Sequence, residues 1–86
     1  MPTVFPADRA MALYAEVRKL EEYEREVRYA YTNVSGVERT LRLDKATETI
    51  RPETGAADFL FRAVARKIAS AWVHGESAPD RLIVQS

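Results

Sequence analysis

The sequence predicts a small α+β domain in which two helices pack on one face of a three- or four-stranded, mainly antiparallel sheet. Three patterns indicate this class: alternating strands around a Gly-containing turn over residues 25–43, helical spacing before and after that stretch, and an apolar run near the C-terminus. The predicted order is helix, strand, strand, an optional short strand, helix and strand. Helices on one face of such a sheet bury the apolar surface of both layers.

The first helix is predicted over residues 6–23. Pro6 suits a first helical turn, where its missing N–H costs nothing. The apolar positions that follow recur at helical spacing, namely Ala10, Leu13, Tyr14, Val17 and Leu20. A rival interpretation extends this helix to about residue 33, because Val27, Tyr31 and Val34 continue a heptad-like series. Residues 24–33 are therefore read either as a strand or as more helix, and their β-branched and aromatic content favours the strand.

The hairpin prediction comes with a register. A three-residue loop over residues 34–36 ends on Gly36, which adopts a left-handed conformation at low cost. This loop pairs Asn33 with Val37, Tyr31 with Arg39, Tyr29 with Leu41, and Val27 with Leu43, so the apolar sets coincide on one face. A two-residue loop would instead place Tyr29 opposite Arg42. Tyr29 and Tyr31 are therefore predicted to be core residues.

The rest of the chain supplies the remaining elements. Residues 44–46 read as a turn, residues 47–50 as a third short strand, and Pro52 closes that strand. Thr54 is predicted to cap a second helix that ends near Gly75. Residues 81–85 read as the final strand.

Composition narrows the class of protein. The 86 residues are predicted to form one domain, residues 1–86, and its 13 basic and 13 acidic side chains cancel. Zero net charge disfavours a strong sequence-independent nucleic-acid binder. Without cysteine, neither disulfides nor thiolate metal sites form, and no metal or cofactor is expected. No apolar run reaches the length of a membrane span, so a cytoplasmic protein is expected. Abundant Arg and Ala suggest a GC-rich coding genome, and a bacterial or phage origin is expected.

The polar face of the hairpin contains the first candidate site. The predicted register sets Arg28 opposite Arg42, and opposed like charges are unfavourable unless something neutralises them. One interpretation is that these arginines, with neighbouring Arg39 and Thr40, bind an anion or a carboxylate of a partner.

The other interpretation is internal neutralisation. Glu26 and Asp44 are also opposed in this register, so diagonal pairs of Arg28 with Asp44 and of Arg42 with Glu26 would balance the charges. Exposed pairs of this kind contribute little to stability.

The final strand contains the second candidate site, formed by Leu82, Ile83 and Val84. It must find a sheet edge, either the hairpin of its own domain or a second copy of the chain, which would make a homodimer. Exposed strand edges also bind partner peptides.

These patterns favour a small non-enzymatic protein-interaction module. A regulator or inhibitor, such as an antitoxin, an immunity protein or a phage-encoded anti-defence protein, is typical at this size. The alternative is a small RNA- or nucleotide-binding domain that uses the arginine-bearing sheet face. A third hypothesis, an enzyme or small-ligand binder with a pocket between helix and sheet, has less support because no catalytic motif occurs in the sequence.

Overall fold

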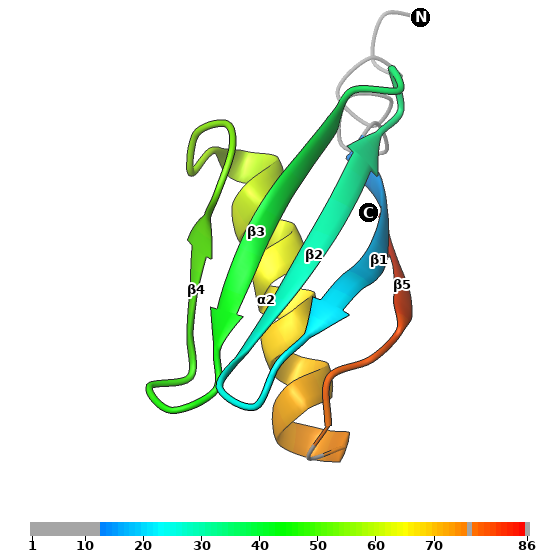
Figure 1. Ribbon diagram of the computed structural model, residues 1–86. Coiled ribbons are helices and arrows are strands. Elements are labelled where there is room, and N and C mark those ends of the chain that lie inside the picture. Colours follow the sequence, from blue (N-terminus) through cyan, green and yellow to red (C-terminus); the bar gives the residue numbers. More distant parts are fainter. Residues whose placement is uncertain (1–12, 76, 86) are drawn as a thin grey trace, which may run out of the picture.

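Five antiparallel strands form one sheet in the computed structural model, which describes residues 13–75 and 77–85 (Figure 1). The strands lie side by side in the order β4-β3-β2-β1-β5. Their bounds are Tyr14–Glu22 for β1, Glu26–Asn33 for β2, Glu38–Asp44 for β3, Thr49–Pro52 for β4 and Arg81–Gln85 for β5. Helix α2, Phe59–Gly75, connects the two edge strands β4 and β5.

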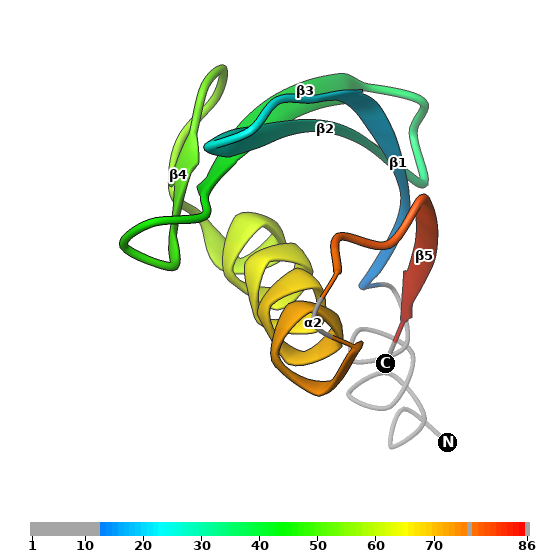
Figure 2. The ribbon, with the colours of Figure 1, turned by 60° about the horizontal axis from the view of Figure 1, so that its bottom comes forward.

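The sheet curls around α2, so that the helix lies within its concave side (Figure 2). The core fills the space between them, with α2 contributing Phe61, Val64 and Ile68. The buried strand residues of this core are Ala15, Val17, Val27, Tyr29, Tyr31, Leu41, Leu43 and Val84. The convex side of the sheet faces away from α2 and is rich in charged side chains.

The α+β class is confirmed, but the predicted helix over residues 6–23 is wrong where the structure describes it. Residues 14–22 form β1, and residues 6–12 lie outside the described residues. Ala15 and Val17 are buried while Glu16 and Arg18 are exposed, which is the two-residue period of a strand. Pairing with β2 on one side and β5 on the other overrides the helical preference of Leu, Glu, Lys and Arg. The described residues therefore form five strands and one helix, where the sequence predicted three or four strands and two helices.

The hairpin prediction is confirmed in type and register, and the rival helix over residues 24–33 is wrong. Tyr31 pairs with Arg39, Tyr29 with Leu41 and Val27 with Leu43. The loop closes through the Asn33 N–H, which donates to the Val37 carbonyl at 3.1 Å, and Gly36 has a φ of 84°. Tyr29 and Tyr31 are both core residues.

The short strand and the second helix exist but begin later than predicted. The Asp44 carboxylate accepts hydrogen bonds from the N–H groups of Ala46 and Thr47, which builds the turn before β4. Helix α2 begins at Phe59 rather than near Thr54, and its cap is Asp58, whose carboxylate accepts from the Phe61 N–H at 2.9 Å.

The final strand is confirmed, and it pairs within its own chain. Its neighbour is β1, with Ala15 opposite Val84 and Val17 opposite Leu82. This neighbour was not predicted, because residues 14–22 were read as helix.

Candidate functional site

Three arginines form a row across the convex face. Arg28 on β2 lies opposite Arg42 on β3, as the sequence predicted, and Arg42 lies opposite Arg51 on β4. We call Arg28, Arg42 and Arg51 the arginine row. Opposed like charges destabilise a sheet, so the row requires neighbouring negative charge.

Glu53 supplies that charge between the first two arginines. Its backbone N–H donates to the Thr40 carbonyl at 2.9 Å, which continues the β3–β4 ladder and turns its side chain to the convex face. The carboxylate accepts from Arg28 Nε at 3.1 Å and from Arg42 Nε at 2.7 Å. The hydrogen bonds from Arg28, which have the larger effect, and from Arg42 lower the pKa of Glu53 to about 2. The carboxylate therefore stays charged at neutral pH and joins β2, β3 and the residue after β4.

A β-bulge brings a second carboxylate to Arg28. The β1–β2 register shifts between Lys19 and Glu21, which places Glu21 opposite Arg28 on the convex face. Without the bulge, the unshifted register would set Leu20 opposite Arg28 and direct Glu21 toward the core. The Arg28–Glu21 contact measures 2.7 Å, and this hydrogen bond lowers the pKa of Glu21.

The diagonal neutralisation considered from the sequence occurs in part. Arg42 lies 3.5 Å from Glu26, as that interpretation requires. Arg28 binds Glu21 and Glu53 instead of Asp44, whose carboxylate is used in the turn before β4. The charges of Arg28 and Arg42 are thus balanced by Glu26 and by two residues that were not predicted at this place, Glu21 and Glu53.

Arg39 lies apart from Arg28 and Arg42. Its position opposite Tyr31 puts it on the concave side, where it contacts the capping residue Asp58 at 2.9 Å. Gly55, at a φ of 81°, lies against its side chain, and a Cβ built on Gly55 would be 2.6 Å from Arg39 Cδ. Arg39 thereby ties β3 to the start of α2.

Thr40 does share the convex face, but its polar groups are occupied. Its N–H donates to the Thr54 hydroxyl at 2.9 Å, and the two hydroxyls lie 3.3 Å apart. The structure therefore brings together Arg28, Arg42 and Thr40, and leaves Arg39 on the other side of the sheet. Anion or partner binding at these residues stays a prediction.

The second candidate site, at β5, forms one edge of the sheet in the part of the chain that the structure describes. The Lys19 N–H donates to the Asp80 carbonyl at 2.8 Å, one step beyond the Arg18–Arg81 pair. Backbone groups of successive strand residues point to opposite sides, so Leu82 and Val84 direct their N–H and C=O groups toward β1. Arg81, Ile83 and Gln85 direct theirs away from the sheet.

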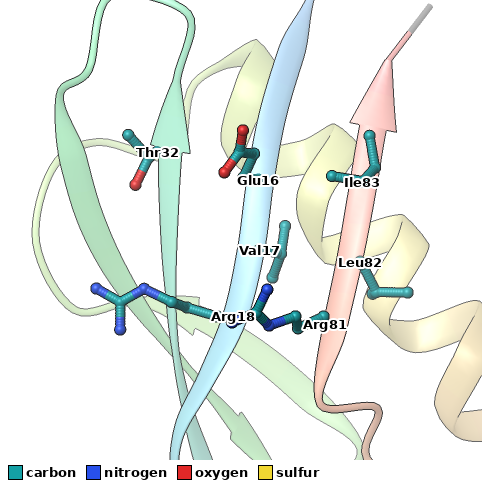
Figure 3. A pocket seen from close by; sticks show the side chains of 7 residues that line it. All are labelled: Glu16, Val17, Arg18, Thr32, Arg81, Leu82 and Ile83. Atoms are coloured by element: carbon teal, nitrogen blue, oxygen red, sulfur yellow. The ribbon is translucent and has the colours of Figure 1, made fainter.

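The side chains of β5 alternate in the same regular way. Val84 is buried and Leu82 half-buried against the core, whereas Ile83 is 49% exposed on the convex side. Beside Ile83 is a shallow hollow of about 150 Å³, whose lining side chains come from β1, β2 and β5 (Figure 3). It is half the size of the smallest usual small-molecule pockets, and suits a single side chain better than a nucleotide.

The other edge of the sheet is protected. Strand β4 has four residues and ends at Pro52, which lies opposite Leu41. Because the β3–β4 hydrogen bonds run through Thr40 and Glu53, Pro52 directs its nitrogen away from β3, where proline offers no donor. The two edges therefore differ: β4 is short and closed by proline, and β5 presents outward backbone groups beside an exposed isoleucine.

The described residues were also compared with what a metal site and a membrane-spanning helix require. Residues 13–75 and 77–85 contain no group of three or more His, Asp or Glu side chains placed to hold a metal ion. Within the same part of the chain, no helix has the length and apolar character needed to cross a membrane.

Two residues that matter on the convex face, Glu53 and Glu21, were missed from the sequence. A signal for Glu53 existed, because a β3–β4 ladder that continues past Pro52 brings residue 53 opposite Thr40.

Comparisons with models of protein families, with curated proteins and with solved structures give no match to this chain.

Proposed function

We propose that this chain is a small non-enzymatic protein-interaction module that binds a partner through the outer edge of β5. The observation that carries the proposal is the edge at Arg81, Ile83 and Gln85, which no other strand covers within residues 13–75 and 77–85. The backbone groups of these residues point away from the sheet, beside the exposed Ile83 side chain. An extended partner segment gains main-chain hydrogen bonds at such an edge, and side-chain contacts provide specificity.

The contrast between the two edges supports the same proposal. Natural sheets protect their edges with short strands, proline and charge, as β4 does with Pro52 and Arg51. Strand β5 has a charge only at Arg81, at its start, and Leu82, Ile83 and Val84 follow it. An edge without proline, next to an exposed isoleucine, is expected where pairing with another chain is the function. The proposed role is that of a regulator or inhibitor, acting in the cytoplasm by occupying a surface on its partner.

RNA or nucleotide binding through the arginine row is the weaker candidate. Its support is the third arginine, Arg51, which extends the row beyond Arg42. Against it, Glu53 already binds both Arg28 and Arg42 on the protein's own surface. A phosphate would have to displace a carboxylate held by two guanidinium groups, and that displacement reduces its net gain.

An edge-blocking substitution tests the proposal. Ile83→Pro removes an N–H that points away from β1, so the intramolecular β1–β5 hydrogen bonds remain. A strand of the partner would no longer find the central N–H donor of the β5 edge. Ile83→Val is the matched control, because it keeps both the N–H and a β-branched side chain. Tagged wild-type protein and Ile83→Val should recover one stoichiometric partner from native cell extract at physiological concentration, and Ile83→Pro should not.

Two results would contradict this proposal. One is recovery of the same partner by Ile83→Pro at wild-type yield, while circular dichroism shows that all three proteins are folded. The other is recovery of no stoichiometric partner by the wild-type protein, together with a monomeric mass in solution.

A further inference from the structure

We infer that the partner for which the β5 edge is built is a second copy of this chain, paired antiparallel about a two-fold axis at Ile83. This inference rests on the proposed function and adds the identity of the partner and the register. Two identical β5 strands that pair about a two-fold axis must run antiparallel. Each pair of residues across the interface then occurs twice, except that a residue on the axis faces its own equivalent in the second copy.

The outward backbone groups select one register. Only Arg81, Ile83 and Gln85 direct their N–H and C=O groups outward in β5, so hydrogen-bonded pairs across the axis must join these residues. A register centred on Ile83 uses all three, and pairs Arg81 with Gln85 of the second copy and Ile83 with its own equivalent. Moving the axis toward either end of the strand leaves one or two of these residues without a partner.

The side chains agree with this register. On the convex face Ile83 meets Ile83, and the two half-exposed side chains cover each other. Arg81 faces an uncharged Gln85 rather than another Arg81, so no like charges oppose. On the concave face Leu82 faces Val84 of the other copy, which extends both apolar cores. A register centred on Arg81 would instead set two guanidinium groups directly against each other, which is unfavourable.

The product is one continuous sheet built from both five-stranded sheets, with both α2 helices on its concave side. The bare β5 edges disappear at the centre, and the outer edges are the two β4 strands, which end in Pro52. After self-pairing, the two free edges of the combined sheet are therefore the β4 edges, which are protected by proline.

Cysteine cross-linking tests the register directly, because these 86 residues contain no cysteine. Opposed residues of a hydrogen-bonded antiparallel pair have Cα atoms about 5.5 Å apart, which is within disulfide reach. Ile83→Cys should form a disulfide-linked dimer under mild oxidation, visible on a non-reducing gel. Arg81→Cys alone should not, since its equivalent would lie roughly 13 Å away, four residues along the strand. The double variant Arg81→Cys/Gln85→Cys should cross-link again.

Sedimentation of the unmodified chain completes the test. The wild-type protein should sediment as a dimer, and Ile83→Pro should weaken the dimer roughly thirtyfold or more, because both central N–H donors are lost. Cross-linking of Arg81→Cys with itself, or a dimer that Ile83→Pro leaves intact, would overturn this inference. A third outcome is that the wild-type protein is a monomer and binds a different protein, and that Ile83→Pro abolishes this binding. That outcome would overturn the second copy as the partner, but it would leave the proposed function standing.

Discussion

Arg28 and Arg42 lie directly opposite each other on β2 and β3, and both bind the carboxylate of Glu53. The shared carboxylate converts an unfavourable pair of like charges into a bridge across two strands. The Glu53 side chain is only 19% exposed, which makes its contacts stronger than those of an isolated surface ion pair. The convex face is therefore held together by specific contacts.

Replacing Glu53 by Gln should destabilise the protein by roughly 1 kcal/mol, because the amide keeps the shape but leaves two opposed arginines without their shared charge. Urea unfolding at neutral pH measures the change. Glu26→Gln is the matched control, since the Glu26 side chain pairs with a single arginine among the described residues, Arg42 at 3.5 Å. A loss from Glu26→Gln equal to that from Glu53→Gln would show that the bridge has no special role.

The stability of the protein should fall in acid through Glu53. The folded-state pKa of Glu53, about 2, lies below its ordinary value of 4.5, so the unfolded chain takes up the proton first as the pH falls. The contribution of Glu53 is complete above about pH 4.5 and is lost as the pH drops toward 2. The difference in unfolding free energy between wild type and Glu53→Gln should shrink across this window. A difference that stays constant from pH 6 to pH 2.5 would contradict the lowered pKa.

The two buried tyrosines of β2 should differ in how much stability is lost when the hydroxyl is removed. The Tyr29 hydroxyl donates to the Pro79 carbonyl at 2.6 Å, which ties the sheet to the segment before β5, and burial raises the pKa of Tyr29 to about 12. The Tyr31 hydroxyl is buried and forms no hydrogen bond within the described residues. Tyr29→Phe should cost roughly 1–2 kcal/mol, whereas Tyr31→Phe should be neutral or slightly stabilising.

Thermal unfolding of both variants measures this contrast, and each serves as the control for the other because the substitution and the strand are the same. Equal losses of stability in the two variants would contradict the assignment of the Tyr29–Pro79 hydrogen bond as the tie to β5.

Alanine at the two left-handed glycines should separate backbone strain from crowding. Gly36 has a φ of 84° and open space around it, so Gly36→Ala should cost only the conformational penalty of roughly 1–2 kcal/mol. Gly55 has a φ of 81°, and its added Cβ would also collide with Arg39. Gly55→Ala should therefore destabilise more, because the Arg39–Asp58 contact at the start of α2 must shift.

Chemical denaturation of both variants provides the comparison. If Gly55→Ala costs no more than Gly36→Ala, the close packing of Arg39 on Gly55 contributes nothing to stability.

The hairpin could be predicted in detail because its information is local. Apolar alternation, a Gly-ending loop of three residues and the coincidence of two apolar faces all lie within residues 26–44, and together they define the pairing of Arg28 with Arg42. The final strand was predicted for a similar reason, since its contiguous apolar residues are typical of a strand.

The first strand could not be predicted by the same means. Its residues fit helical spacing as well as alternation, and Leu, Glu, Lys and Arg favour helices locally. The choice depends on β2 and β5, which lie on either side of β1 and satisfy its backbone groups. The residues that β1 pairs with in β5 lie more than 60 positions further along the chain, so no local window contains the deciding contacts.

By itself, the sequence determined the α+β class, the hairpin register and the opposition of Arg28 and Arg42, because alternation and turn chemistry act between neighbours in the chain. Only the tertiary structure decided that residues 14–22 form a strand, that Glu53 and Glu21 neutralise the arginines, and that β5 is a sheet edge. Those outcomes depend on a β-bulge, on the continuation of the β3–β4 ladder and on pairing between distant strands. Each of these features depends on backbone hydrogen bonds between segments that come close together only in the folded chain.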